Sequence, residues 1–303
     1  MKKLILSFLL LLPTTACICQ NFPPPFGGQM KNTSDNLYHL KAGNLSMTVD
    51  LDMGAKILSL KLDDKEIISQ IQRREAFGST FWTSPQREWN WPPVQEFDKK
   101  PYTVEDSSAT RLVLKSQVSE RLKYSVGKEI TLEENGQSVV INYSITNEGS
   151  ETRQVAPWEI TRVVNEGVIF FDAPIDSITP AGEMNFEEAH GVVWYQTDEA
   201  QRNRKINADA TGWLAYSANG LLLVKLFQDL KAGQPAPNEA EVQVYVNQGK
   251  TFIELESQGA YTTLAPGEHL TWTVRWFLLP VDVEGVPSAT LVKKVKELVK
   301  KYQ

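Results

Sequence analysis

The chain has 303 residues, of which 42% are hydrophobic and 22% are charged, so it holds ample apolar material for a folded core and is neither collagen-like nor largely disordered. Its 37 acidic residues outnumber its 31 lysines and arginines. The resulting net charge of −6 argues against a nucleic-acid-binding protein, because such proteins rely on a basic surface. Only three histidines and two cysteines are present, which argues against a zinc site, and no metal or other cofactor is expected.

The first nineteen residues (1–19) have the order of a secretory signal peptide. Two lysines precede an apolar stretch over residues 4–12, and small residues follow it. We therefore expect an exported protein, located in the periplasm, at the cell envelope or outside the cell. Two processing routes fit this order. Signal peptidase I could cleave near Cys19, or Cys17 could carry a lipid anchor, because residues 14–17 resemble a bacterial lipobox.

After residue 19, the sequence predicts one domain that has no membrane-spanning helix. No segment approaches the roughly eighteen consecutive apolar residues that a membrane-spanning helix requires. Residues 20–35 contain Pro, Gly and Ser without periodicity, which predicts an N-terminal tether. Over residues 36–303 no boundary in composition divides the chain, so we expect a single domain.

Alternation of apolar and polar residues dominates this domain and predicts β-strands with one buried face. Turn residues separate the alternating runs, and Asn219-Gly220 is typical of a tight hairpin. Many short strands without helical crossovers predict an all-β fold, a large antiparallel sandwich. The clearest runs lie at residues 45–51, 112–114, 122–126, 139–145, 242–246 and 270–276.

A single helix is predicted, at the end of the chain over residues 288–302. After Pro287, apolar residues recur at three- and four-residue spacing from Leu291 to Val299, and lysines occupy the opposite face. We expect this helix to dock on a sheet with its lysines in solvent. A membrane-surface or partner-binding helix is the alternative, which the absence of Trp and Phe from the apolar face disfavours.

Residues 77–93, FGSTFWTSPQREWNWPP, form the most unusual segment. They contain Trp82, Trp89 and Trp91, and three prolines that predict a rigid loop rather than an interior strand or helix. Indole faces stack on sugar rings, and side chains such as Arg87 donate hydrogen bonds to hydroxyl groups, so the segment suits carbohydrate recognition. The alternative is that the aromatic rings fill the open end of a sandwich.

Residues 251–259, TFIELESQG, place two carboxylates on one face of a predicted strand. Glu254 and Glu256 point one way, and the residues at 253 and 255 point the other. At a rise of ~3.3 Å per residue the two carboxylates lie about 6.6 Å apart. On a solvated face they would have no function. On a face turned toward the tryptophan-rich segment, one of them suits a general base or an acceptor for sugar hydroxyls.

Residues 156–163, APWEITRV, predict a strand with charges on both faces. Trp158 and Arg162 share one face, and Glu159 lies on the other. Either Arg162 or Glu159 can reach a ligand, or both are surface charges of the sheet that contact no ligand. The sequence contains no GxSxG, HExxH, GxGxxG or Walker motif, so serine hydrolase, metalloprotease and nucleotide-binding functions lack their main support.

The order of these features resembles the galactose mutarotase-like (aldose 1-epimerase-like) supersandwich proteins, in particular secreted bacterial members. The resemblance covers about residues 40–282. It rests on a strand pair around Gly54, on the segments FWTSPQREWNWPP and VAPWEITRV, and on FIELESQG followed by a Pro-Gly turn and HLTWTVRWFLLP. It implies a β-supersandwich fold and a carbohydrate ligand, either a monosaccharide or an oligosaccharide.

The resemblance also implies a catalytic role for Glu256. In mutarotases a glutamate in a similar Leu-Glu-Thr-Gln strand takes the proton of the anomeric hydroxyl, and residues 255–258 read Leu-Glu-Ser-Gln here. Mutarotases also use two histidines. Trp158 stands at or beside the position of one, and no histidine lies between His39 and His190, where the other would fall.

Three functions therefore remain open. The favoured one is a secreted carbohydrate-binding protein that is non-catalytic or weakly active. The second is an aldose 1-epimerase-like isomerase with Glu256 as general base and Arg or Tyr in place of histidine. The third is a structural or interaction sandwich whose tryptophans belong to the core. For the first two, the expected ligand contacts are Trp82, Arg87, Trp89, Trp91, Glu159, Arg162 and Glu254.

Overall fold

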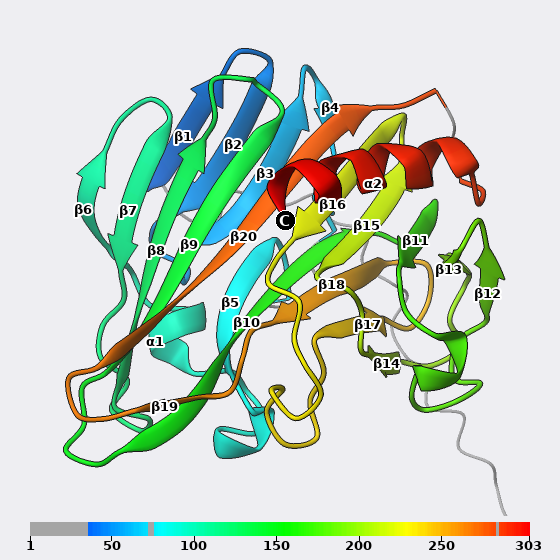
Figure 1. Cartoon of the computed structure of the whole chain (residues 1–303). Coiled ribbons are helices and arrows are strands. Elements are labelled where there is room, and N and C mark those ends of the chain that lie inside the picture. Colours follow the sequence, from blue (N-terminus) through cyan, green and yellow to red (C-terminus); the bar gives the residue numbers. More distant parts are fainter. Residues whose placement is uncertain (1–35, 72–75, 283–284) are drawn as a thin grey trace, which may run out of the picture.

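A computed structural model describes residues 36–71, 76–282 and 285–303 of the chain. The expected signal peptide, tether and Cys17 anchor lie outside these residues. The described part consists mainly of two ten-stranded sheets in which all paired strands run antiparallel (Figure 1). This arrangement confirms the predicted large antiparallel β-sandwich. No helix in the described part is long and apolar enough to cross a membrane.

The first sheet contains the strands that carry the candidate site. Its order is β1-β2-β3-β5-β10-β18-β17-β14, with β4 paired to β3 and β19 paired to β10. The strands are β1 (Leu37–Ala42), β2 (Leu45–Asp50), β3 (Lys56–Leu62), β4 (Lys65–Glu66), β5 (Ser79–Ser84), β10 (Arg153–Val164), β14 (Arg204–Ala208), β17 (Val242–Val246), β18 (Phe252–Gln258) and β19 (Thr262–Leu264).

The second sheet has the order β12-β13-β11-β15-β16-β20-β9-β8-β7-β6. Its strands are β6 (Thr103–Ser107), β7 (Arg111–Lys115), β8 (Tyr124–Leu132), β9 (Ser138–Asn147), β11 (Val168–Phe171), β12 (Phe186–Ala189), β13 (Val192–Gln196), β15 (Trp213–Ala218), β16 (Leu221–Leu226) and β20 (His269–Pro280). The hairpin between β15 and β16 turns through Asn219-Gly220, and both residues have positive φ. A two-residue turn of this kind fits the twist of antiparallel strands.

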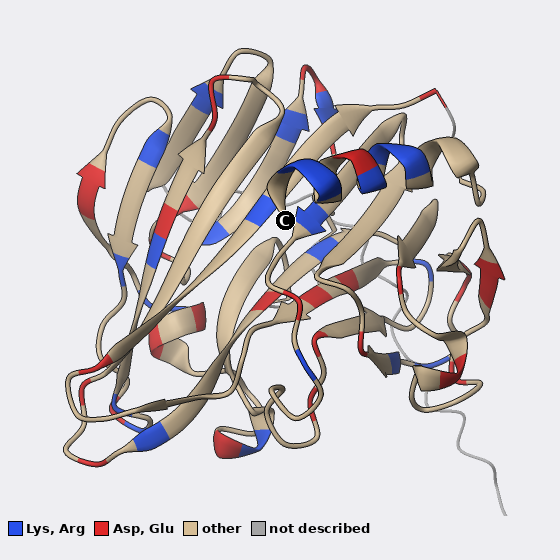
Figure 2. Ribbon diagram, viewed as in Figure 1, with Lys and Arg blue, Asp and Glu red and all other residues tan. Residues whose placement is uncertain are grey.

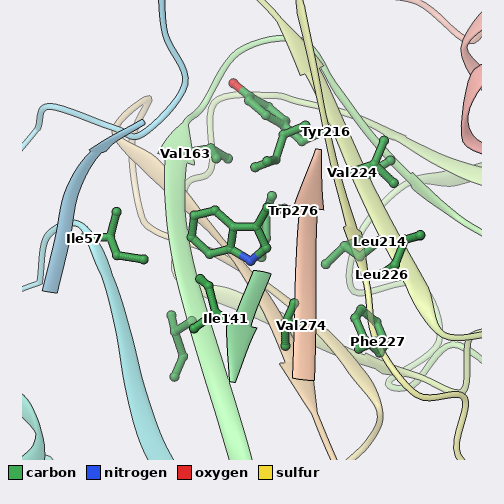
Figure 3. Close-up of a cluster of buried hydrophobic side chains, with 14 of the residues drawn as sticks. Ile57, Ile141, Val163, Leu214, Tyr216, Val224, Leu226, Phe227, Val274 and Trp276 are labelled. Carbon is green, nitrogen blue, oxygen red and sulfur yellow. The ribbon is translucent and has the colours of Figure 1, made fainter. Parts of the chain in front are cut away.

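The hydrophobic core lies between the two sheets. Along β9 and β20, buried residues alternate with more exposed ones over most of the strand, which is the pattern that their sequences predict. Figure 3 shows Trp276 of the second sheet beside Ile141 and Val274, with Val163 of the first sheet on the facing side. Burial of these apolar side chains on both sheets supplies the main stabilisation of the sandwich.

The expected C-terminal helix is α2 (Ala289–Tyr302), which packs on β16. The Ser288 side chain caps its first turn by accepting a hydrogen bond from the Thr290 amide. Leu291 and Val295 face the sheet, and the lysines of the helix are spread along its remaining surface (Figure 2). The helix therefore covers a sheet with its apolar stripe, as its sequence predicts.

The tryptophan-rich segment departs from its expected structure. Residues 79–84 form β5, which lies between β3 and β10 inside the first sheet. The prediction of a loop throughout residues 77–93 was wrong for this half, because the first proline is Pro85 and its restriction begins only there. After Pro85 the chain forms two short helices, η1 (Gln86–Glu88) and α1 (Gln95–Asp98), as it leaves the sheet.

Candidate functional site

A cavity of about 700 Å³ lies on the face of the first sheet that is turned away from the core. Strands β5, β10, β14, β17 and β18 supply residues to it, together with the segments that follow β5 and β17. The volume falls within the range of roughly 300–1,000 Å³ that is usual for small-molecule sites. Of the expected site residues, the ones that line this cavity are Trp82, Trp91, Arg162, Glu254 and Glu256.

Glu256 of β18 has an unpaired acceptor atom in the wall of the cavity. Its side chain is almost fully buried, and its Oε2 accepts hydrogen bonds from Trp158 Nε1 and from Lys205 Nζ, each at 2.9 Å. Its Oε1 is buried and has no hydrogen-bond partner among the described residues. A buried carboxylate oxygen is normally satisfied by protein, water or ligand. Because Glu256 lines the cavity, Oε1 is an unsatisfied acceptor at the cavity wall, with almost no exposed surface of its own.

Burial raises the pKa of the Glu256 carboxyl above its ordinary value, because desolvation penalises the charged form. The nearby Lys205 ammonium group offsets part of this rise in pKa. The Lys205 side chain is one-third exposed. The same Nζ lies 4.7 Å from the ring centroid of Trp158. A carboxylate with a raised pKa and a fixed cationic partner is well suited to accept a proton or a hydrogen bond from a hydroxyl group.

Arg162 of β10 is the second buried charge beside the cavity. Its Nη2 lies 2.7 Å from Oε1 of Glu254, and its Nη1 donates to the Phe77 carbonyl at 3.1 Å. The guanidinium carbon lies 5.9 Å and 5.8 Å from the ring centroids of Trp82 and Phe252. These contacts fix the guanidinium group, so its main effect is to hold the Glu254 carboxylate in place.

Four of the eight tryptophans form one cluster beside the cavity, and one of these four is exposed. Trp82 makes edge-to-face contacts with Trp89, Trp91 and Trp158, with ring centroids 5.6, 6.2 and 5.4 Å away. Trp91 is 67% exposed, whereas the other three are buried. Exposed indole next to a polar cavity is the usual platform for the apolar face of a sugar ring. Trp91 is therefore the residue of the cluster placed to stack on a ligand.

The position of Trp82 depends on a carboxylate from α1. Asp98 Oδ1 accepts hydrogen bonds from Trp82 Nε1 and Thr80 Oγ1, both at 2.9 Å. Asp98 also forms a buried ion pair with Lys56 at 3.2 Å. Lys56 and nearby Arg162 favour the charged form of Asp98, and despite its burial the pKa of this carboxyl is lowered. The short helix therefore anchors the floor of the cavity.

Three expected ligand contacts lie outside the cavity. Glu159 faces the core instead, where it forms a 2.6 Å ion pair with Lys225, and both side chains are fully buried. Trp89 is 2% exposed and donates its Nε1 hydrogen to the Thr83 carbonyl at 2.8 Å, so it supports the cluster from behind. Arg87 is exposed on η1 and does not line the cavity. None of the three is positioned to touch a ligand bound there.

Lys205 is the main site residue that the sequence analysis missed. It lies on β14, where Ile206 and Ala208 are buried and alternate with the partly exposed Lys205 and Asn207. That alternation places Lys205 and Asn207 on one face of a short strand, but nothing in the local sequence indicates which distant residue either one meets. Tyr245 of β17, directly opposite Lys205 in the register, also lines the cavity and was missed.

The ionised groups of the cavity are balanced in pairs. Arg162 is paired with Glu254, and Lys205 is paired with Glu256. No group of three or more His, Cys, Asp or Glu side chains in the described part is placed to hold a metal ion. The arrangement offers an aromatic platform, one free carboxylate oxygen and several hydrogen-bonding groups, which is the chemistry that binds a polyhydroxylated ring.

Neither a profile of a protein family nor a curated protein sequence matches the chain. Solved structures match it in fold. A candidate aldose 1-epimerase of Escherichia coli K12 shares 14% identity at a TM-score of 0.61, over 81% of this chain and 99% of that protein.

Two further structures agree with this match. A galactose mutarotase-like protein of Lactobacillus casei shares 12% identity at a TM-score of 0.52, over 80% of this chain and 100% of that protein. An aldose epimerase homologue of C. elegans shares 10% identity at a TM-score of 0.54, over 81% of this chain and 99% of that protein. The chain therefore has the galactose mutarotase-like fold, and these identities carry no statement about its activity.

Proposed function

We propose that the protein is an exported carbohydrate-binding protein whose ligand occupies the cavity above β10 and β18. The observation that carries the proposal is the buried, unpaired Oε1 of Glu256 in a cavity that also presents Trp91. The carboxylate accepts a hydrogen bond from a sugar hydroxyl, and the indole covers the apolar face of the ring. Export, and membership of a secreted bacterial branch of proteins with this fold, rest on the order of residues 1–19.

The proposal is tested by titrating the exported protein with a panel of neutral monosaccharides and oligosaccharides, followed by tryptophan fluorescence and calorimetry. A bound sugar should quench the fluorescence of the cluster. Trp91→Ala should weaken binding by about 1–2 kcal/mol, the size of a lost aromatic contact. Val118→Ala serves as the matched control, because Val118 is also exposed and apolar but lies outside the cavity. Absence of binding across the whole panel would favour a structural or interaction sandwich.

The Lys205–Glu256 pair supports a second candidate function, aldose 1-epimerase activity. Glu256 Oε1 would take the proton of the anomeric hydroxyl, the electron pair of that O–H bond would form the C=O bond, and the bond from the anomeric carbon to the ring oxygen would break. Lys205 Nζ would give its proton to the ring oxygen. Rotation about the bond between the anomeric carbon and its carbon neighbour and reversal of both transfers would then produce the other anomer.

Polarimetry on freshly dissolved α-D-glucose and α-D-galactose separates the two functions. Enzyme-dependent mutarotation that is lost in both Glu256→Gln and Lys205→Met would establish the isomerase. Sugar binding without mutarotation would establish the binding protein. The binding function is preferred because the adjacent Lys205 ammonium group favours the charged form of the Glu256 carboxyl, which makes this carboxylate a weaker base for the anomeric proton.

A further inference from the structure

A second cavity, of about 480 Å³, lies next to the first, at the β14 edge of the first sheet. Its walls come from the end of β14, from the segment that leads into β17, and from residues near Thr179. Thr179 and Asn207 exchange backbone hydrogen bonds at 2.9 and 2.7 Å, which ties the Thr179 segment to the outer edge of β14. This cavity is not part of the site proposed above.

Strand β14 connects the two cavities. Lys205 lines the first and Asn207 lines the second. They are two positions apart on one strand, so they share a face and are separated by about 6.6 Å along it. That separation is comparable with the length of one sugar unit in a chain. A ligand bound beside Lys205 therefore needs only one further unit to reach the second cavity.

The walls of the two cavities are in direct contact. The backbone amide of Gln86, which lines the first cavity, donates to Glu239 Oε1, which lines the second, at 3.0 Å. Glu239 Oε2 accepts from Gln243 and Gln258 at 3.0 and 3.2 Å. The boundary between the cavities is therefore polar and hydrogen-bonded, rather than an apolar ridge that a sugar chain would avoid.

The charges along this path select against an anionic ligand. In the first cavity the positive charges of Arg162 and Lys205 are balanced by the carboxylates of Glu254 and Glu256, so the described lining of the cavity has no excess of cations to attract an acidic sugar. The titratable residues that line the second cavity are Asp209, Glu239 and Glu241, all carboxylic acids, and no lysine or arginine of the described part lines it. Burial raises the pKa of the Glu241 carboxyl to about 8, so the repulsion of anions is assigned to Asp209 and Glu239. Carboxylates accept hydrogen bonds from sugar hydroxyls and repel uronate, sulfate and phosphate groups.

We propose that the ligand is a neutral oligosaccharide of at least two units, with one unit over Glu256 and the next in the second cavity against Asn207 and Asp209. This inference rests on the proposed carbohydrate-binding function and specifies its substrate class. Asp209 is exposed, so its replacement tests the second cavity without disturbing the fold.

The experiment compares neutral glycans of one to six units, of varied monosaccharide composition, and acidic oligogalacturonates. Affinities are measured for the wild type, Asp209→Ala and the control Asp64→Ala, which replaces an exposed aspartate outside both cavities. We expect affinity to rise about tenfold or more from one unit to two or three and then to level off. Asp209→Ala should remove most of that gain without changing the affinity for the single unit.

The outcomes separate the two proposals. If no glycan of any length binds, the carbohydrate-binding function itself fails. If a single sugar binds as tightly as the longer chains, or if Asp209→Ala weakens all lengths equally, the second cavity is not a subsite and the first proposal stands alone. If oligogalacturonates bind as tightly as neutral chains, the inference of a neutral ligand is wrong.

Discussion

Lys205 and Glu256 are 51 positions apart in the sequence, yet the ammonium nitrogen of the first lies 2.9 Å from a carboxylate oxygen of the second. The pair joins β14 to β18 across the intervening strand β17. It leaves the other carboxylate oxygen of Glu256 unpaired. The lysine therefore favours the charged form of a buried carboxylate and contacts only one of its two oxygens.

Sugar binding should depend on the protonation of Glu256. Because burial raises the pKa of this carboxyl, affinity should fall as the pH decreases, with a midpoint above the ordinary range of glutamate. In Lys205→Met the charged form loses its cationic partner, so the midpoint should move to higher pH. Titrations across a pH series measure both midpoints. Glu256→Gln cannot ionise at this position, and a pH dependence that survives in it would assign the effect to another group.

Mutation of Trp89 should mainly lower the stability of the protein, whereas mutation of Trp91 should mainly weaken sugar binding. Trp89 is buried, so Trp89→Ala is expected to lower the free energy of unfolding by about 3–5 kcal/mol through loss of packing and creation of a cavity. Trp91 is 67% exposed, so Trp91→Ala should change that free energy by less than about 0.5 kcal/mol while weakening sugar binding. Urea unfolding and sugar titration on both variants provide the comparison. A stable Trp89→Ala protein with weakened binding would make Trp89 a ligand contact after all.

Most of the fold was predictable because many strands bury one face in the core and leave the other face more exposed to solvent. In β9 and β20 the buried residues follow a two-residue period, so sequence alone locates the strands and their inward faces. Strand β5 was not predicted, because the whole of residues 77–93 was assigned to a loop on account of its prolines. These prolines all follow residue 84 and do not restrict the backbone of β5. Strand β14 was not predicted either, because it is short and its two buried apolar residues are too few to establish a two-residue period.

The site was predictable only in part, for a related reason. Strand β10 is buried over nine consecutive residues, so burial alone could not decide whether Glu159 or Arg162 faces a ligand. The structure resolves this, because the second sheet covers the Glu159 side and the cavity lies on the Arg162 side. Lys205 was missed because a lysine on a short strand is usually solvated. Only its contact with Glu256 distinguishes it.

The Glu159–Lys225 pair should contribute to stability without affecting the ligand. Glu159→Gln leaves the buried ammonium group of Lys225 without its counterion and should lower the free energy of unfolding by about 3–5 kcal/mol. The double variant Glu159→Gln/Lys225→Met removes both charges and keeps an acceptor for the Tyr143 hydroxyl, which donates to Glu159 at 2.9 Å. It should recover much of the loss. A double-mutant cycle in urea measures the coupling.

Sugar affinity provides the second readout for this pair. Since Glu159 faces the core, the double variant should bind sugar as the wild type does. A selective loss of affinity in a folded double variant would mean that Glu159 contacts the ligand, in contradiction to its placement between the sheets.

Lys128 should make the stability of the protein rise with pH in alkaline solution. Its Nζ is buried and donates to the carbonyls of Gly54 and Ala55 at 2.7 and 3.0 Å, and desolvation, together with the nearby cation of Lys56, lowers its pKa to about 7. In the unfolded chain a lysine keeps a pKa of about 10.4. Between these two values the unfolded state binds more protons than the folded state, so the free energy of unfolding increases with pH.

The contribution of Lys128 is complete above the unfolded pKa and is lost as the pH falls toward 7, with a slope of up to about 1.4 kcal/mol per pH unit. Lys128→Met removes the titrating group but retains most of the side-chain volume. Urea unfolding of both proteins at pH 7, 8 and 9 should show the wild type gaining stability relative to the variant at each step. The difference between the two proteins cancels the other alkaline titrations to first order. If the two stability curves run parallel over this range, the Lys128 ammonium group keeps its proton in the folded protein, and burial in this core does not neutralise it.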